Sequence, residues 1–127
     1  MPKRILVIDD EEAVRDAFVL ALDGMDYIVD TASCGEAGLK KALENKPDLV
    51  FLDLKMPGIG GVETLQQLQS HYTKLPVYIV TAFYQEFMEP LKEAAARGFS
   101  LQVAQKPLSG EEIRLIVTST LEKQQVY

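Results

Sequence analysis

The sequence predicts one α/β domain built on a parallel five-stranded sheet with helices on both faces. Short apolar runs alternate five times with segments in which apolar residues recur at helical spacing, a pattern typical of repeated β-α units. The runs show little polar alternation, which indicates strands covered on both sides. With 127 residues, of which 47% are hydrophobic, the chain can bury one core and has little room for a second. We therefore expect residues 1–127 to form a single doubly wound (βα)5 domain with right-handed crossovers.

The predicted strands are short runs rich in apolar and β-branched side chains. They are expected at residues 5–8, 27–32, 49–52, 77–80 and 101–104. In an open parallel sheet, ligands bind outside the carboxyl ends of the strands, near the point where the strand order reverses. Functional side chains are therefore expected just after these runs.

The first two predicted helices each have an apolar face and a recognisable end. The first is expected to end at Gly24, and the second to begin with a capping box of Ser33 and Glu36 and to end at Asn45-Lys46-Pro47. The face of the first comprises Ala13, Ala17, Leu20 and Ala21, and that of the second Ala37, Leu39, Ala42 and Leu43.

The other three predicted helices are bounded by glycine-containing turns. The third follows Met56-Pro57-Gly58, the fourth covers roughly residues 85–97 and stops at Gly98, and the fifth follows Ser109-Gly110. The apolar residues of the third are Val62, Leu65 and Leu68, and those of the fifth are Ile113, Ile116, Val117 and Leu121.

Composition narrows the classes of function. The formal net charge of −6 argues against binding to a nucleic-acid backbone, which requires a basic face. A single cysteine, Cys34, excludes an internal disulfide or a cysteine-based metal cluster and is compatible with a reducing compartment. The apolar run before Asp9 is too short for a signal peptide or a membrane span. We expect a cytoplasmic protein that does not bind membranes.

Charged and hydroxyl side chains follow four of the five predicted strands. Their clustering at one sheet edge would gather at least three carboxylates, a hydroxyl and an ammonium group. Oxygen ligands without histidine or cysteine favour a hard cation such as Mg²⁺. An aspartate held beside that ion can attack phosphorus and form an acyl phosphate. The residues are Asp9, Asp10 and Glu11 after the first strand, Asp53 after the third, Thr81 after the fourth and Lys106 after the fifth.

Each of these residues also has an ordinary structural interpretation. Asp9 and Asp10 could cap the first helix, and Asp53 could be a turn residue before Pro57-Gly58. Thr81 could simply end a strand, and Lys106 could be solvated. The coincidence of all of them at one sheet edge favours the functional interpretation.

The chain resembles, over about its whole length, the receiver domain of bacterial two-component response regulators. The combination of motifs is highly specific, although each motif alone is weak. The matching segments are Ile5-Leu6-Val7-Ile8-Asp9-Asp10-Glu11, Pro47-Asp48-Leu49-Val50-Phe51-Leu52-Asp53-Leu54-Lys55-Met56-Pro57-Gly58, Val80-Thr81-Ala82 and Lys106-Pro107. The resemblance implies a flavodoxin-like fold with strand order 2-1-3-4-5.

The resemblance also implies a role for each matching residue. Asp53 would be the phosphoacceptor. Asp10 and Asp53 would ligate Mg²⁺ directly, with Asp9 acting through water and the Lys55 backbone carbonyl completing the protein ligands. Lys106 would contact the phosphoryl group and an acidic neighbour, and Thr81 would be the switch hydroxyl. Ala82 would leave room for the phosphoryl group, and the Lys106-Pro107 bond would be cis.

Two features depart from or modify the family pattern. The family carries an aromatic residue three positions before the lysine, where this chain has Val103, so the usual coupling between Thr81 and that aromatic is in doubt. Phe99, Phe83 or Tyr84 could substitute, although packing is the commoner role of an aromatic residue. Lys55 and Phe83, each two residues beyond Asp53 and Thr81, predict slow hydrolysis of the phosphoryl group.

The favoured function is a phosphorylation-activated signalling module that is not a turnover enzyme. A sensor histidine kinase or a histidine phosphotransfer protein would donate the phosphoryl group. The face formed by the fourth helix, fifth strand and fifth helix would then change its affinity for an effector, a fused output domain or a second copy. The residues leave open whether the chain stands alone or is part of a longer regulator.

Three alternatives belong to other classes. A haloacid-dehalogenase-type phosphatase would place its nucleophile after the first strand with another aspartate two residues on, where this chain has Glu11. A flavodoxin-like electron carrier would need a phosphate loop, and the acidic run beginning at Asp9 would repel the FMN phosphate. A pseudo-receiver would bind partners without phosphorylation, but the complete set of reactive residues argues against it.

Overall fold

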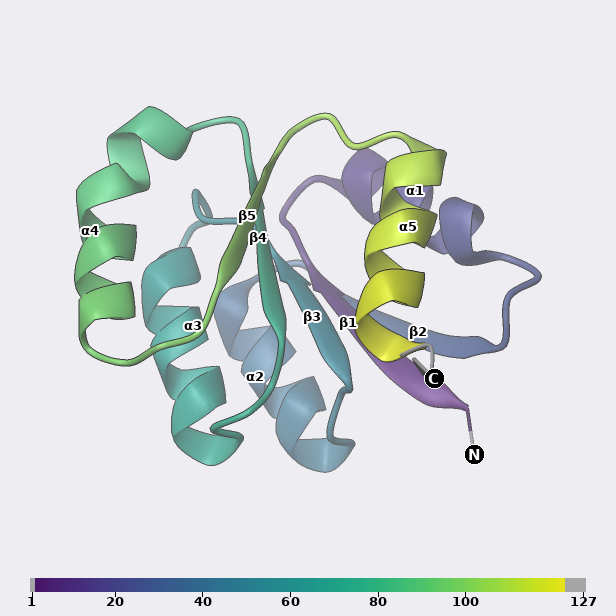
Figure 1. Cartoon of the computed structure of the whole chain (residues 1–127), viewed down its shortest axis with the longest axis horizontal. Helices are drawn as coiled ribbons and strands as arrows, with labels where there is room; N and C mark the ends of the chain where they lie inside the picture. The colour runs from purple at the N-terminus through teal and green to yellow at the C-terminus, as the bar shows by residue number, and fades with distance from the viewer. Residues whose placement is uncertain (1, 123–127) are drawn as a thin grey trace, which may run out of the picture.

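The computed structural model describes residues 2–122 and contains one five-stranded parallel sheet with helices on both faces (Figure 1). The strand order is β2-β1-β3-β4-β5, and all four pairings are parallel, which confirms the predicted fold. The elements are β1 (Lys3–Ile8), α1 (Glu12–Leu22), β2 (Tyr27–Ala32), α2 (Gly35–Glu44), β3 (Leu49–Leu52), α3 (Gly60–His71), β4 (Val77–Thr81), α4 (Tyr84–Ala96), β5 (Gln102–Gln105) and α5 (Gly110–Leu121). In the part of the chain that the structure describes, no helix could span a bilayer.

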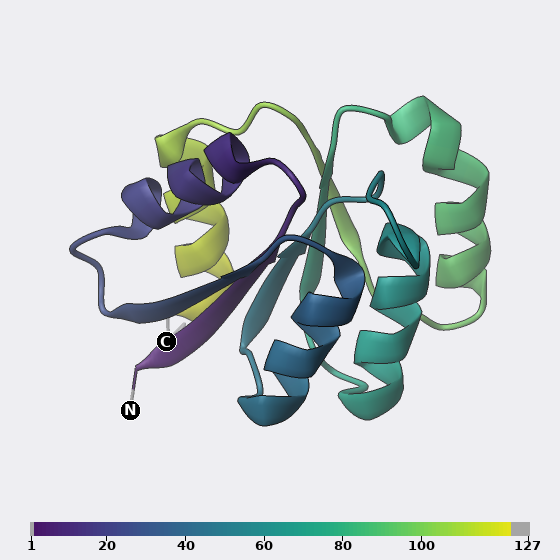
Figure 2. The same ribbon diagram turned by 180° about the vertical axis from the view of Figure 1, so that it is seen from behind.

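The sheet separates two apolar cores. Helices α1 and α5 cover one face, and α2, α3 and α4 cover the other (Figures 1 and 2). Alternate residues of β1 supply the two cores, with Ile5 and Val7 on the α1 side and Leu6 and Ile8 on the α3 side. All four are essentially buried, and burial of each aliphatic side chain contributes about 1.5–3 kcal/mol.

The buried face of α1 differs from the predicted one. Ala13 and Ala17 are exposed and Leu20 is 77% exposed. Phe18 lies at the centre of the buried face instead, with its ring centroid 4.7 Å from that of Phe51. The large aromatic ring removes more apolar surface from water than the alanines would, so it sets the rotation of the helix. The residues of this face that contact the core are Val14, Phe18, Ala21 and Leu22.

The predicted capping box at Ser33 and Glu36 is wrong. The N-cap of α2 is Cys34, whose Sγ accepts a hydrogen bond from the Ala37 N–H at 3.4 Å. The first turn of α2 packs so closely against α3 that a Cβ on Gly35 would lie 2.2 Å from the Thr64 hydroxyl oxygen. This packing places Gly35 in the first turn of the helix, so the N-cap is the residue before it, Cys34. At the other end of α2, Leu43, predicted to face the core, is about half exposed.

The remaining helix boundaries agree closely with the predictions. A capping box is present at α5, where Ser109 Oγ accepts from the Glu112 N–H at 3.1 Å and the Glu112 carboxylate accepts from the Ser109 N–H at 2.9 Å. Gly24 and Gly98 have φ of +83° and +95°, the left-handed conformation that ends a helix and favours glycine.

Candidate functional site

The strand order reverses between β1 and β3, and this reversal positions the acidic residues. The connection after β1 leads to α1 on one face and that after β3 leads to α3 on the other (Figures 1 and 2), and in open parallel sheets ligands bind at the carboxyl ends of the strands beside such a reversal. The sheet hydrogen bonding continues one residue beyond the strands. The Asp53 N–H donates to Ile8 O at 2.9 Å, and the Lys106 N–H donates to Thr81 O at 3.0 Å. These bonds fix the backbone from which the site projects.

Lys106 joins the acidic groups of the site. Its Nζ lies 2.8 Å from Asp9 Oδ2, 3.2 Å from Glu11 Oε1 and 3.5 Å from Asp53 Oδ2. Burial alone would lower the pKa of Lys106, but the hydrogen bond and charge of Asp9, the charge of Asp53 and the hydrogen bond to Glu11 leave it above its ordinary value. The ammonium group therefore stays charged at neutral pH.

Asp53 carries a carboxylate in an unfavourable setting. It is 4% exposed, and its Oδ1 accepts a hydrogen bond from the Leu54 N–H at 2.8 Å. Burial, together with the charge of Asp9, raises the pKa of Asp53 to about 6, although Lys106 and the Leu54 N–H act in the opposite direction. A raised carboxyl pKa beside other charged groups is typical of functional sites.

Three carboxylates can hold a cation together. Asp9, Asp10 and Asp53 each offer an oxygen, and these oxygens lie within 4.8 Å of one another. Oxygens on opposite sides of a bound Mg²⁺ are about 4 Å apart, so small side-chain shifts would bring this cluster to the spacing that one such ion requires. Asp10 is exposed, whereas Asp9 and Asp53 are buried. Neither Asp9 nor Asp10 is the N-cap of α1, which is Glu11.

Thr81 and its neighbours form the other wall of the site. Thr81 is fully buried, and its Oγ1 accepts a hydrogen bond from the Phe83 N–H at 2.9 Å. The Lys55 ammonium lies 4.2 Å from the centre of the Phe83 ring and 3.7 Å from Glu86 Oε2. The segments after β3 and β4 therefore contact one another beside the acidic cluster.

The other predicted site residues lie at the same sheet edge or on the edge strand. The Lys106-Pro107 bond is cis, as predicted, and Ala82 is exposed next to Thr81. Val103 is 36% exposed on β5, paired with Ile79. Of the aromatic residues that could replace the missing one, Tyr84 and Phe99 pack against the core of the α2–α4 face, whereas Phe83 is 40% exposed.

Two contacts of the site had no signal in the sequence. Arg15 Nη1 donates to the Asp9 carbonyl at 2.7 Å, and Glu86 pairs with Lys55. The first contact spans six residues and depends on how the chain turns from β1 into α1. The second joins segments 31 positions apart and depends on how α4 packs.

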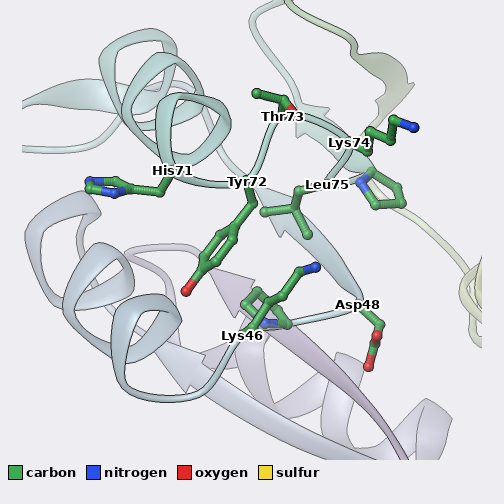
Figure 3. Close-up of a pocket in the computed structure, with 9 residues that line it drawn as sticks. Lys46, Asp48, His71, Tyr72, Thr73, Lys74 and Leu75 are labelled. Carbon is green, nitrogen blue, oxygen red and sulfur yellow. The ribbon is translucent and has the colours of Figure 1, made fainter.

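Hollows in the surface do not suggest a different site. One of about 450 Å³ lies at the amino edge of the sheet, where its side chains are labelled in Figure 3. There, His71 and Lys74 point away from each other. Another, of about 360 Å³, borders the acidic site between α1 and the segment after β5, with Glu11 and Lys106 at its edge and apolar residues such as Phe18 and Leu108 along it.

Known sequences identify the family. The family model described as the response regulator receiver domain matches residues 5–118. The alkaline phosphatase synthesis transcriptional regulatory protein PhoP of Bacillus subtilis is 36% identical over 127 residues, which are 99% of this chain and 51% of that protein. Response regulator GacA of Pseudomonas viridiflava is 38% identical over 116 residues, which are 89% of this chain and 54% of that protein. The chain thus spans about half the length of these curated relatives.

Solved structures agree with the sequence comparison. A CheY-like receiver domain protein from Methanospirillum hungatei has a TM-score of 0.86 at 24% identity, covering 97% of this chain and 96% of its own, which supports the fold alone. TrrA of Thermotoga maritima, solved in complex with Mg²⁺ and BeF, has a TM-score of 0.78 at 34% identity and covers 94% of this chain and 99% of its own. With the family match over residues 5–118, these findings show that the chain belongs to the receiver domains of two-component response regulators.

Proposed function

We propose that this receiver is activated by transfer of a phosphoryl group from a phosphohistidine to Asp53. The observation that carries the proposal is the setting of Asp53: a buried carboxylate beside Asp9, Asp10 and the Lys106 ammonium, at the carboxyl edge of the sheet. Such a carboxylate is stabilised when a cation and a phosphoryl group complete its surroundings.

The chain's own residues account for the transfer step. A carboxylate oxygen of Asp53 attacks phosphorus, the N–P bond of the phosphohistidine breaks, and the imidazole leaves with the bonding electron pair. Lys106, 3.5 Å from Asp53 Oδ2, neutralises charge on the transferring oxygens. The Leu54 N–H holds Asp53 Oδ1 at 2.8 Å and so orients the attacking carboxylate.

A bound Mg²⁺ would supply charge neutralisation on the phosphoryl oxygens. Receiver domains bind Mg²⁺ at an acidic pocket, and this chain has such a cluster. In our proposal, Asp10 and Asp53 hold the ion directly, Asp9 acts through water, and the Lys55 carbonyl is the remaining protein ligand. The exposure of Asp10 leaves one side of the cluster accessible to the ion and its water molecules.

Thr81 is proposed to convert the new phosphoryl group into a conformational change. Its hydroxyl oxygen accepts from Phe83, and its proton remains available for a phosphoryl oxygen. The face of α4, β5 and α5 then changes its affinity for partners. Ala82, exposed beside Thr81, leaves space for the phosphoryl group.

The lifetime of the phosphoryl group is proposed to be long, because Lys55 and the bulky Phe83, which contact each other at 4.2 Å, are expected to limit the access of water to Asp53. Replacing Phe83 by Ala should speed hydrolysis by about threefold or more, since water then reaches the site more freely. The measurement is the decay of the phosphorylated protein by intact mass in the presence of Mg²⁺. A wild-type half-life no longer than that of a fast chemotaxis regulator would contradict the proposal.

The partners and context are proposed from the family. We expect a sensor histidine kinase or histidine phosphotransfer protein as donor, an effector or fused output domain as target, and a cytoplasmic setting. Residues 1–127 are proposed to form one receiver domain. The net charge of −6 argues against direct nucleic-acid binding by this domain.

Phosphorylation with a small acyl phosphate tests the assignment of Asp53. Wild-type protein treated with Mg²⁺ and acetyl phosphate should gain the mass of one phosphoryl group. Asp53→Ala should gain none, and Asp16→Ala, a control at an exposed aspartate of α1, should behave as wild type. A label on Asp9 would support the phosphatase alternative, and no label on wild type would support a pseudo-receiver.

A further inference from the structure

The backbone carbonyl of Asp9 lies just past the end of the sheet and is held by a side chain of α1. The Asp9 N–H still donates to Ala32 O at 3.0 Å, but β2 ends at Ala32. The Asp9 carbonyl oxygen accepts instead from Arg15 Nη1 at 2.7 Å. The Arg15 N–H donates to Glu11 O at 3.1 Å, so the start of α1 anchors the arginine that holds the end of β1.

This bond satisfies a buried backbone group with a charged donor. Asp9 is 3% exposed, and a buried carbonyl without a partner is costly, whereas a bond from a guanidinium is stronger than one from a neutral donor. Among residues 2–122, no carboxylate forms an ion pair with Arg15, although Glu12 and Asp16 are close in sequence. The guanidinium is therefore used on a backbone oxygen at the acidic site.

The two neighbouring aspartates are held in different ways. The Asp9 carboxylate has contacts of its own, since Oδ1 accepts from the Glu11 N–H at 2.9 Å and Oδ2 lies 2.8 Å from Lys106 Nζ. The Asp10 carboxylate is exposed and has no hydrogen bond or ion pair in the described part of the chain, so its direction depends on the backbone. The peptide plane that joins Asp9 to Asp10 contains the Asp9 carbonyl, and Arg15 fixes that plane.

We propose that Arg15 is a positioning residue for the metal site: by holding the Asp9 carbonyl it directs Asp10 toward the ion and so sets the affinity for Mg²⁺. This role deepens the proposed function and rests on its assignment of Asp10 as a direct ligand. Arg15 itself contacts neither the ion nor the phosphoryl group. Groups that orient metal ligands from behind typically change metal affinity by about 10- to 100-fold.

Position and charge predict opposite effects for this arginine. A guanidinium near the site repels a divalent cation, so if charge alone mattered, Arg15→Met would bind Mg²⁺ more tightly than wild type. Loss of the orientation of Asp10 makes the same variant bind more weakly. Lys106 is the contrasting case, because its ammonium contacts Asp9 Oδ2 directly and repels the ion from within the cluster. The sign of the change therefore separates the two explanations.

Calorimetric titration of the metal-free protein with Mg²⁺ tests the role. Arg15→Met should weaken binding by about tenfold. Arg15→Lys keeps the charge but replaces the planar fork by a single ammonium, and should weaken binding by about threefold. The matched control is Arg114→Met, which removes an arginine whose Nη1 donates to the carbonyl of Ala21, in the last turn of α1, at 3.4 Å. Lys92→Met removes an exposed lysine of α4, and both controls should bind as wild type does.

Equal or tighter binding by Arg15→Met, or wild-type affinity in Arg15→Lys, would overturn the positioning role. Circular dichroism of the metal-free proteins shows whether each variant is folded. If Arg15→Met is not folded, Arg15→Lys decides alone, because its unchanged charge leaves geometry as the cause of any weakening.

The rate of Asp53 labelling by acetyl phosphate gives a second measurement. Arg15→Met should need about tenfold more Mg²⁺ for half of its maximal rate. The maximal rate itself should stay close to that of wild type, because Asp53 and Lys106 are unchanged. A lower maximal rate with an unchanged Mg²⁺ requirement would place Arg15 in the transfer step and overturn its role in positioning Asp10.

The two measurements separate failure of this role from failure of the proposed function. If acetyl phosphate labels Asp53 and the Arg15 variants bind Mg²⁺ as wild type does, the positioning role is wrong and phosphorylation stands. If wild type takes up no phosphoryl group but the Arg15 variants bind Mg²⁺ more weakly, the assignment of Asp53 fails and the positioning role stands. If wild type binds no Mg²⁺, both fail.

Discussion

In the proposed reaction, Asp53 has to be charged in surroundings that oppose the charge. Burial and the charge of Asp9 raise its pKa from 3.8 to about 6, which corresponds to at most about 3 kcal/mol of lost stability at neutral pH, at 1.4 kcal/mol per pH unit. The positive charge of Lys106 offsets part of this loss of stability, and a bound cation would offset more. In the proposed function, stability is given up for reactivity at this residue.

Asp53→Asn should therefore stabilise the metal-free protein. At pH 7 we expect the free energy of unfolding to rise by about 2 kcal/mol, because the variant removes the buried charge and keeps the shape. As pH falls from 6 to 4, the folded wild type takes up a proton before the unfolded chain does, so wild type gains stability relative to the variant. The difference should vanish near pH 4, as measured by urea unfolding in the presence of EDTA.

Asp48→Asn is the informative comparison for this prediction. Asp48 is half-buried and accepts a hydrogen bond from the Arg4 N–H at 2.8 Å, but it lies at the opposite edge of the sheet, away from other carboxylates of the site. Its replacement should not stabilise the protein. An Asp53→Asn variant less stable than wild type at pH 7 would show that Lys106 outweighs burial.

Lys106→Met should have opposite effects on metal binding and on metal-free stability. Removing the ammonium 2.8 Å from Asp9 Oδ2 abolishes its repulsion of a cation, so the affinity for Mg²⁺ should rise by about tenfold. The metal-free protein should become less stable, because the carboxylates lose their counter-charge. Calorimetric titration with Mg²⁺ and urea unfolding measure the two effects, with Lys92→Met as control; weaker Mg²⁺ binding by Lys106→Met would contradict the prediction.

At the scale of the element, the N-caps of the helices show which helix starts depend on local sequence and which depend on tertiary contacts. The capping box at Ser109 and Glu112 is complete within α5, so Ser109→Ala should cost about 1 kcal/mol of unfolding free energy. Ser33→Ala should cost less than about 0.5 kcal/mol, because Ser33 is exposed and Cys34 caps α2. Thermal unfolding of both variants checks the pair, and equal losses would mean that Ser33 contributes to the α2 cap after all.

The same contrast explains how much of the fold the sequence predicts. Strands covered on both faces leave a continuous apolar pattern, so β3 is found at its predicted bounds, Leu49–Leu52. The start of α2 and the rotation of α1 are not found, because they depend on Gly35 lying against Thr64 and on Phe18 contacting Phe51. Such contacts join elements distant in the chain, and local patterns do not contain them.

The candidate site follows the same rule. Asp9, Asp53, Thr81 and Lys106 are predictable because each directly ends or follows a strand, and parallel strands end at one edge. The contacts of Lys55 with Phe83 and Glu86 are not predictable, since they depend on where α4 begins and how it packs. Gln69 of α3 is a similar case: it is buried, and its amide oxygen accepts from the Ser100 N–H at 2.8 Å, a bond over 31 positions.

At the scale of the whole molecule, the carboxyl edge of the sheet differs in character from the two faces. The cores on both faces are apolar and continuous, whereas the carboxyl edge gathers Asp9, Asp10 and Asp53 with Lys106. The stability of the domain should therefore respond to conditions through this edge. Cation binding and protonation compete for the same carboxylates there.

Mg²⁺ should stabilise the domain in a manner that depends on pH. A ligand that binds only the folded state adds RT ln(1 + [L]/Kd), which is about 2.7 kcal/mol at a concentration one hundred times Kd. Because the Asp53 pKa is about 6, the carboxylate is ionised at pH 7.5 and mostly protonated at pH 5. The rise in Tm with Mg²⁺ should therefore be large at pH 7.5 and small at pH 5.

Asp10→Asn and Asp16→Asn separate this linkage from a general effect of salt. Asp10 belongs to the acidic cluster and Asp16 does not, and both are exposed, so their replacement changes net charge equally. Only Asp10→Asn should lose most of the rise in Tm at pH 7.5. If Mg²⁺ raises the Tm of both variants as much as that of wild type, or does so equally at pH 5 and 7.5, the ion acts elsewhere on the surface, because protonation of Asp53 must weaken any site that uses its charge.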